Sequence, residues 1–151
     1  MWQHSFETTT ALAPEQIWPV IADVASWAEV DHNIASIQVD GTPAVGTGFR
    51  LKPKGGPTLK FKITAFDPPH SYADCCRIPG ASMTTWHRIL ATTSLGEPTR
   101  IVVEIIVIGP LAWFWGPVAA SKHAAGLPAQ TERILARARS RLVATDVSAA
   151  A

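Results

Sequence analysis

Residues 14–27 read PEQIWPVIADVASW, a stretch in which a helix start, two tryptophans and an internal proline follow one another. Pro14 suits the first position of a helix, because an N–H at that position has no intrahelical partner in any case. Pro19 lies further inside, and we expect it to shorten or kink the helix. Asp23 is a good helix-capping residue, so a second short helix is predicted around residues 24–29. The stretch therefore predicts two short helices in series.

Length and composition predict one domain with a substantial core. The chain has 151 residues, of which 47% are hydrophobic and 17% charged, and its net charge is +1. A chain of this length buries a core without disulfides or metal. Its small net charge gives no general attraction for nucleic acid. We predict a single domain over residues 1–143, a disordered tail over residues 144–151, and no nucleic-acid partner.

Targeting segments, membrane spans and metal motifs are not found in the sequence. The first ten residues, MWQHSFETTT, lack the basic and apolar regions of a secretory signal. The longest uncharged run, residues 105–121, is shorter than the roughly 20 residues of a membrane span and contains two Gly-Pro pairs. Cys75 and Cys76 are adjacent, so they form no ordinary disulfide and have no second pair at metal-ligand spacing. We predict a cytoplasmic protein with reduced thiols, no metal and no cofactor.

The period of the apolar residues predicts an α+β fold. Alternation typical of half-buried strands recurs along the chain, and after residue 117 the apolar period becomes helical, with Pro128 expected to bend that helix. About seven strands are predicted. One begins at Ile34, and the others are residues 2–9, 49–54, 58–66, 71–78, 82–93 and 99–108. The apolar face of the long helix is predicted to contain Ala120, Ala124, Leu127, Thr131, Ile134, Leu135, Ala138 and Leu142.

This order of elements and the motif at residues 11–30 resemble the START-related SRPBCC superfamily, in its polyketide cyclase/dehydrase and lipid-transport branch. The residues that carry the resemblance are Ala13-Pro14, Ile17-Trp18, Asp23 and Trp27, with Gly109-Pro110 and Gly126-Leu127-Pro128 later in the chain. The resemblance covers almost the whole sequence. It implies a helix-grip fold, in which an antiparallel curved sheet of about seven strands wraps around a long C-terminal helix. Two short helices after the first strand close a cavity between the sheet and that helix.

The resemblance also implies that the cavity binds a hydrophobic small molecule, lipid-like or polyketide-like. Val30 stands where many relatives have a further tryptophan, so we expect the cavity to be wider there. The alternative is that the inward side chains simply fill a solid core. The predicted ligand-binding residues are Phe6, Trp27, Val30, Phe49, Leu51, Phe61, Ile63, Trp86, Arg88, Val103, Ile105, Trp113 and Leu127.

No catalytic template occurs in the sequence. It contains no nucleophile elbow, no HExxH zinc motif and no glycine-rich phosphate loop. His4, His87 and Arg88 are weak candidates for a catalytic role, since a lone histidine is more often structural. His4 alternates with Trp2 and Phe6, which makes it the best candidate for an imidazole that points into the cavity.

The faces of the strand predicted at residues 82–93 are ambiguous, because a shift of one residue exchanges them. Pairing of Leu90 with Ile101 turns Arg88 inward, whereas the other register turns His87 inward. An inward Arg88 can bind a ligand carboxylate or enolate through its planar fork. Without a ligand its expected ionic partner is Glu104 or Asp74.

Two surface features suggest a partner. The strands predicted at residues 49–54 and 58–66 form a hairpin with one basic face, which we call the basic hairpin. It is predicted to place Lys52 near Lys60 and Arg50 near Lys62, and like charges that face each other favour an anionic partner. A solvated strand face is the alternative. The segment LAWFWG at residues 111–116 has three alternative interpretations: a gate to the cavity, a lip that touches a membrane, or a plug for the end of the core. A transient membrane or anionic contact therefore stays open, and the sequence predicts no oligomeric state.

Three functions fit these observations. The first is binding, with or without transport, of a hydrophobic small molecule, and it is favoured by an open and wholly apolar pocket. The second is catalysis by a polyketide cyclase or aromatase, through aldol cyclisation and dehydration, and it is favoured by an open pocket together with an inward Arg88 or a histidine with a shifted pKa. The third is a non-catalytic partner-binding module, which is favoured by the absence of a pocket.

Overall fold

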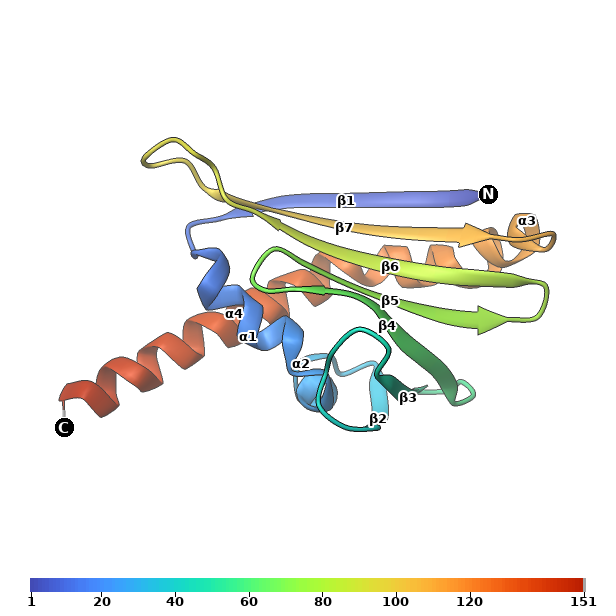
Figure 1. Cartoon of the computed structure of the whole chain (residues 1–151), viewed down its shortest axis with the longest axis horizontal. Helices are drawn as coiled ribbons and strands as arrows, with labels where there is room; N and C mark the ends of the chain where they lie inside the picture. The colour runs from blue at the N-terminus through green and yellow to red at the C-terminus, as the bar shows by residue number, and fades with distance from the viewer. Residues whose placement is uncertain (151) are drawn as a thin grey trace.

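The computed structural model of the protein describes residues 1–150. Seven antiparallel strands form one open sheet in the order β1-β7-β6-β5-β4-β3-β2 (Figure 1). The strands are β1 (Trp2–Thr10), β2 (Ile34–Val39), β3 (Gly48–Pro53), β4 (Leu59–Asp67), β5 (Ser71–Ile78), β6 (Ala81–Leu90) and β7 (Thr99–Ile108). The helical segments are α1 (Pro14–Ala22), η1 (Val24–Ser26), α2 (Trp27–Val30), α3 (Ala112–Trp115), η2 (Gly116–Ala120) and α4 (Ser121–Ala150). The predicted α+β helix-grip fold is confirmed.

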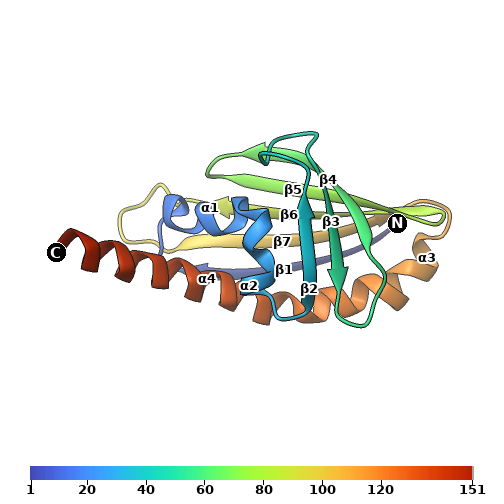
Figure 2. The same ribbon diagram turned by 90° about the horizontal axis from the view of Figure 1, so that it is seen from below.

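Helix α4 lies along one face of the sheet and extends past its edge at the C-terminal end (Figures 1 and 2). The sheet covers a face rich in small and apolar residues, and the buried members are Ala124, Leu127, Thr131, Leu135 and Ala138. These are residues of the face predicted from the sequence. Alanines let the helix axis approach the sheet closely, so that larger side chains of the strands fill the space beside it. The chain stays helical on both sides of Pro128.

The C-terminal tail differs from its prediction. The tail expected to be disordered is residues 144–151, of which Ala151 lies outside the described residues. Residues 144–150 continue α4 as exposed helix up to Ala150. Their composition allows this, because the segment contains no glycine or proline and ends in alanines, the best helix formers.

Helix α1 begins at Pro14 as predicted and continues past Pro19 to Ala22. Pro19 and Glu15 are both exposed, so water can bind the carbonyl of Glu15 that the proline leaves without a donor. Asp23 lies at the predicted cap position of the next helical segment, but its side chain makes no capping hydrogen bond. Its carboxylate instead lies 3.8 Å from the guanidinium of Arg141 on α4. The predicted capping role of Asp23 is therefore wrong.

The register of the basic hairpin also differs from its prediction. Arg50 lies opposite Lys60, and Gly48 lies opposite Lys62, two residues away from the expected pairing. The difference arises at the tip of the hairpin, where β3 ends at Pro53 and β4 begins only at Leu59. The prolines on either side of the two glycines have no N–H, so they cannot donate the hydrogen bonds that would extend the strand pairing. An ion pair of 3.7 Å from Arg50 to Asp40 offsets the remaining contact between like charges.

Within residues 1–150, no helix is both long enough and apolar enough to cross a bilayer. The same part of the chain contains no group of three or more His, Cys, Asp or Glu side chains placed to hold a metal ion. Cys75 and Cys76 are free thiols, and only Cys76 is buried.

We predict that Gly116→Ala destabilises the fold, whereas Gly126→Ala does not. A Cβ at residue 116 would lie 2.3 Å from Cγ of Trp2, a contact that forces the ring or the backbone to move. Overpacking of this kind costs about 1–3 kcal/mol. A Cβ at residue 126 meets nothing within 4 Å, so the matched variant gains only the better helix propensity of alanine. Urea unfolding followed by circular dichroism measures both, and equal stabilities would contradict the packing of Trp2 on η2.

Candidate functional site

A small pocket lies between α4, the sheet and the segment of residues 14–30, which contains α1, η1 and α2 and which we call the lid. Its walls are mostly apolar, and the residues that line it are Val20, Ile21, Trp27, Val30, Asp31, His87, Gln130 and Ile134. The space open to the centre of a water molecule is about 30 Å³, which suits about two waters. A ligand of more than a few atoms therefore requires the lid to move away from α4.

The two lid tryptophans hold the lid on the sheet. The indole N–H of Trp27 donates to the carbonyl oxygen of Ile21 at 3.1 Å. Its ring packs edge-on against Phe49 and Tyr72, with ring centres 5.7 and 5.5 Å apart. Trp18 packs edge-on against Phe66 with a separation of 5.2 Å. Edge-to-face pairs of this kind add about 0.5–1.5 kcal/mol beyond their buried area, so the lid is anchored by aromatic contacts from both of its longer helices.

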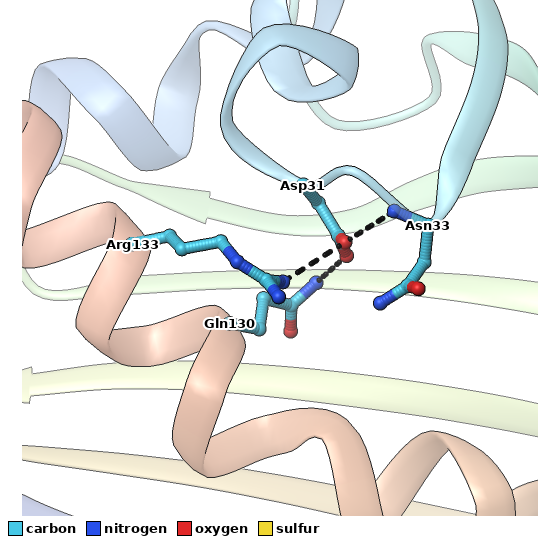
Figure 3. Close-up of polar contacts among 4 residues, drawn as sticks. All are labelled: Asp31, Asn33, Gln130 and Arg133. Carbon is cyan, nitrogen blue, oxygen red and sulfur yellow. Dashed lines mark hydrogen bonds and ion pairs between the residues drawn. The ribbon is translucent and has the colours of Figure 1, made fainter.

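Asp31 joins the end of the lid to α4 (Figure 3). Its carboxylate accepts a hydrogen bond from Nε2 of Gln130 at 3.0 Å and one from the guanidinium of Arg133 at 3.3 Å. It also accepts the backbone N–H of Asn33 at 2.9 Å, which fixes the turn after α2. Asp31 is buried, and a buried carboxylate is stable there because charged and neutral donors satisfy it together.

Two further ion pairs continue this contact along α4. Three arginines spaced four residues apart project from one side of the helix, and each meets an acid of the lid or of its end. The pairs are Arg133–Asp31 at 3.3 Å, Arg137–Glu29 at 3.1 Å and Arg141–Asp23 at 3.8 Å. The last two are substantially exposed, so each contributes about 1 kcal/mol or less. The buried Asp31 group is therefore the main polar attachment of the lid.

The register of β6 turns His87 inward. Ile89 lies opposite Ile101, and Leu90 lies opposite Arg100, so the alternative that pairs Leu90 with Ile101 is wrong. His87 is buried and lies opposite Tyr72 on β5, with ring centres 5.9 Å apart. The histidine thus joins the pocket wall from the sheet side.

Arg88 and Trp86 lie on the outer face of the sheet. The guanidinium of Arg88 is 2.9 Å from the carboxylate of Glu104 and 4.6 Å from the centre of the Trp86 ring. Gln3 donates a further hydrogen bond to Glu104. The predicted contact of Arg88 and Trp86 with a ligand in the cavity is therefore wrong. Of the two partners expected for Arg88, Glu104 is correct and Asp74 is not.

The imidazoles of the site are neutral at pH 7. Burial lowers the pKa of His87 from 6.5 to about 4, and the nearby His123 on α4 lowers it further. Burial also lowers the pKa of His123, which the charge of Asp31 partly opposes. A neutral imidazole has one N–H donor and one nitrogen acceptor, so His87 can bind either a carbonyl or a hydroxyl group.

Tyr72 and Asp74 add two polar groups to the inner face of β5. The hydroxyl of Tyr72 is buried next to the carboxyl of Asp74 and makes no hydrogen bond of normal geometry within residues 1–150. Burial, followed by the charge of Asp74, raises the pKa of this phenol. Asp74 is 4% exposed and has no ion-pair partner within residues 1–150. Burial raises the pKa of its carboxyl from 3.8 to about 7. At neutral pH the inner wall thus offers an uncharged imidazole, an uncharged phenol and a carboxyl that is about half protonated.

The structure separates the predicted ligand-binding residues into three groups. Trp27 and Val30 line the pocket, together with the weak catalytic candidate His87. A second group packs on or inside the core without lining the pocket, so for these residues the solid-core alternative describes the structure: Phe6, Phe49, Leu51, Phe61, Ile63, Val103, Ile105 and Leu127. Trp86, Arg88 and Trp113 point away from the pocket, and Trp113 is 72% exposed.

His4 is also placed differently from its prediction. Its side chain is exposed, and its ring stacks on Trp2 with centres 6.3 Å apart. Because β1 is an edge strand of the sheet, a residue of its inner face can remain in contact with water. The expected inward imidazole is therefore His87 and not His4.

Sequence reasoning missed Tyr72, His123 and Gln130, and it assigned Asp31 and Asp74 no part in the pocket. The sequence does contain a signal for Tyr72 and Asp74. Together with Cys76 they share one face of a strand whose other face includes Arg77. An acid on the buried face of a strand indicates either a partner or a shifted pKa. Asp31 and Gln130 lie 99 residues apart, and no local pattern links them.

A sequence model of the family described as "Polyketide cyclase / dehydrase and lipid transport" matches residues 1–144. The chain belongs to this family. The resemblance drawn from residues 11–30 is thereby confirmed. No curated protein matches the chain.

Solved structures with the same fold cover nearly the whole chain at low identity. The aromatase/cyclase Zhui from a Streptomyces species is 18% identical with a TM-score of 0.68, covering 93% of this chain and 94% of its own. Ara h 8.0201 is 14% identical with a TM-score of 0.72, covering 91% and 97%. A norcoclaurine synthase point mutant of Thalictrum flavum, in complex with a transition-state analogue, is 16% identical with a TM-score of 0.64, covering 89% and 94%. At such identity these structures establish the fold of the family and not the ligand of this member.

We predict that Asp74 and His87 make opposite contributions to the pH dependence of stability. The raised pKa of Asp74, about 7, favours the protonated folded state, so its contribution is lost as pH rises through about 7. The lowered pKa of His87, about 4, favours the neutral folded state, so its contribution is present above about 6.5 and lost as pH falls toward 4. In the native protein the two slopes offset one another between these values.

Single variants should reveal the two slopes of unfolding free energy against pH separately. Between about pH 5 and about pH 8, Asp74→Asn should gain on the order of 2 kcal/mol with rising pH, whereas His87→Gln should lose a similar amount. Urea unfolding at several pH values measures the free energy of unfolding. In the double variant, any rise that remains is due to His123, whose pKa is also lowered. Parallel curves for the native protein and both single variants would contradict the inward placement of these groups.

Proposed function

We propose that the protein binds a hydrophobic small molecule that has an uncharged hydrogen-bonding group, in the pocket under the lid. The observation that carries this proposal is a mostly apolar pocket with the buried, neutral His87 in its wall. An apolar ligand gains roughly 0.8 kcal/mol for each methylene that it buries. The imidazole can then orient a carbonyl, hydroxyl or phenol group of the ligand.

The polar surroundings favour an uncharged group over an anion. The described residues that line the pocket include no arginine or lysine, and the nearby Arg133 is already paired with Asp31. The carboxyl of Asp74 is ionised above about pH 7 and repels a second negative charge. The membership of the chain in a family of cyclases and lipid-transport proteins is in keeping with such a ligand. Binding to a carrier and binding to an enzyme share this first step.

We predict that Val30→Phe weakens ligand binding, whereas Val45→Phe does not. Val30 lines the pocket, so a larger side chain there takes the space that the ligand needs. Val45 is 64% exposed in the loop between β2 and β3, and it makes a control of identical chemistry. The measurement is titration of an environment-sensitive fluorescent fatty-acid analogue, with circular dichroism to show that each variant is folded. We expect at least a tenfold rise in Kd for Val30→Phe.

Native mass spectrometry of the purified protein identifies the ligand independently. A stoichiometric small molecule, released on denaturation, gives the chemical class directly. Unchanged affinity in a folded Val30→Phe variant, together with a protein that contains no apolar small molecule, would rule out the pocket as the binding site.

A second candidate function is proton transfer at a carbonyl ligand, and one observation favours it. The pKa of Asp74, about 7, lies near neutral pH, where a general base is most effective. His87, with a pKa of about 4, is a weak base and is better suited to orienting the ligand. Asp74 is not among the residues that line the pocket, which is why binding comes first.

Deuterium exchange tests this second candidate. Benzoylacetone loses a C–H proton between its carbonyls to a base and takes back a deuteron when the solvent is D2O. If Asp74 is the base, its carboxylate accepts that proton, and protein-dependent exchange rises with pH through about 7. We expect Asp74→Asn to abolish this exchange and Asp67→Asn, an exposed acid of the neighbouring strand, to leave it unchanged. Equal exchange in both variants would exclude Asp74 as the base.

A further inference from the structure

Large apolar side chains are exposed at the end of the molecule that lies away from the lid. They belong to α3, to η2 and to the residues just before α3, where the last strand passes into α4 (Figures 1 and 2). We call this group the α3 patch, and its members with their exposed fractions are Ile108 51%, Leu111 37%, Trp113 72%, Phe114 42% and Val118 46%. Soluble proteins usually expose such residues singly, so a group of this kind indicates a binding surface.

The exposure of the α3 patch is fixed by a rigid support. The indole N–H of Trp115 donates to the carbonyl oxygen of Pro79 at 2.7 Å, and the backbone N–H of Leu111 donates to that of Gly80 at 3.0 Å. The rings of Trp113, Phe114 and Trp115 pack edge-on in sequence, with centres 6.1 and 5.1 Å apart. Trp115 thus turns toward the core and the β5–β6 turn, while its two neighbours stay outside. Of the three roles predicted for this segment, Trp115 has that of the plug.

The charges around the α3 patch are all positive. The segments that form this end, residues 1–3, 75–84 and 106–122, contain Arg77 and Lys122 but no aspartate or glutamate. Arg77 and Lys122 are both exposed.

We propose that the α3 patch and its cations dock the protein on the surface of an anionic lipid bilayer. Trp is suited to the interface between headgroups and acyl chains because its apolar ring has a polar N–H, and Phe adds apolar area that the acyl chains cover. Each cation near an anionic leaflet strengthens the attraction, and no acid opposes it at this end. A second copy of the chain is a poorer partner, since a symmetric contact brings like charges together.

This docking leaves the ligand pocket accessible. The lid lies toward the other end of the sheet from α3, so it remains in contact with water when the α3 patch meets a bilayer (Figure 1). The bound protein is therefore held at the membrane while the pocket opens to the aqueous side. The proposal does not depend on the ligand, and the two can fail separately.

Vesicle co-sedimentation tests the docking. We expect the full chain to bind vesicles of equal parts phosphatidylcholine and phosphatidylglycerol, and to bind pure phosphatidylcholine vesicles weakly. Trp113→Ser with Phe114→Ser should lower the partition coefficient at least tenfold. Leu95→Ser, which removes a fully exposed leucine from the β6–β7 loop, is the matched control and should have no effect. The pocket variant Val30→Phe should bind vesicles like the native protein.

Charge and depth give two further readouts. Arg77→Gln and Lys122→Gln should each lower binding to anionic vesicles roughly fivefold, and added salt should do the same. Brominated phosphatidylglycerol should quench tryptophan fluorescence in the native protein and much less in Trp113→Phe, which keeps an aromatic ring for binding.

Three outcomes would overturn the proposal. The first is that the native chain does not bind the anionic vesicles. The second is that the double serine variant and Leu95→Ser bind equally. The third is that the α3 patch mediates a concentration-dependent dimer, detected by light scattering and lost in the double serine variant, with no vesicle binding; the patch is then a contact between copies.

Discussion

Burial of one face of α4 against a sheet that does not close is the contact on which the rest of the molecule depends. Strands β1 and β2 are the two edges of the sheet, so the helix has to cover the inner face that a closed barrel would hide. Alanines at positions 120, 124 and 138 bring the helix close to the strands. Beyond them the lid covers what α4 leaves open, and the pocket occurs where lid, helix and sheet meet.

The same geometry explains the polar character of the inner wall. Tyr72, Asp74 and His87 stand on central strands that face α4, where water is excluded. Exclusion of water raises the pKa of the acid and lowers that of the imidazole, so both groups tend toward their uncharged forms. A phenol on the same wall that makes no hydrogen bond of normal geometry within residues 1–150 adds a group that a ligand can satisfy. The chamber is therefore better matched to neutral oxygen-containing groups than to ions.

Much of the fold, but less of the site, was predictable from the sequence. Periodicity and the proline at position 14 correctly placed the strands, α1 and the buried face of α4. Strand β6 was ambiguous because both of its faces contain an aromatic ring and a polar group, and only the pairing of Ile89 with Ile101 decides between them. Arg133 and Asp31 meet across 102 residues, and such a contact depends on how the lid closes rather than on any local pattern.

Side chains alternate between the two faces of the sheet along β5 and β6, so substitutions on the inner face and on the outer face have separate effects. Thr85 and His87 point to the chamber, while Arg88 points outward to an ion pair with Glu104, and Cys75 and Cys76 likewise lie on opposite sides of one strand. The wall is thus a single layer of backbone in which successive residues face the buried interior and the water outside in turn. Inner positions can be varied to accept another ligand while the outer ones keep the surface intact. A family built on this wall can diversify its chemistry one alternate residue at a time.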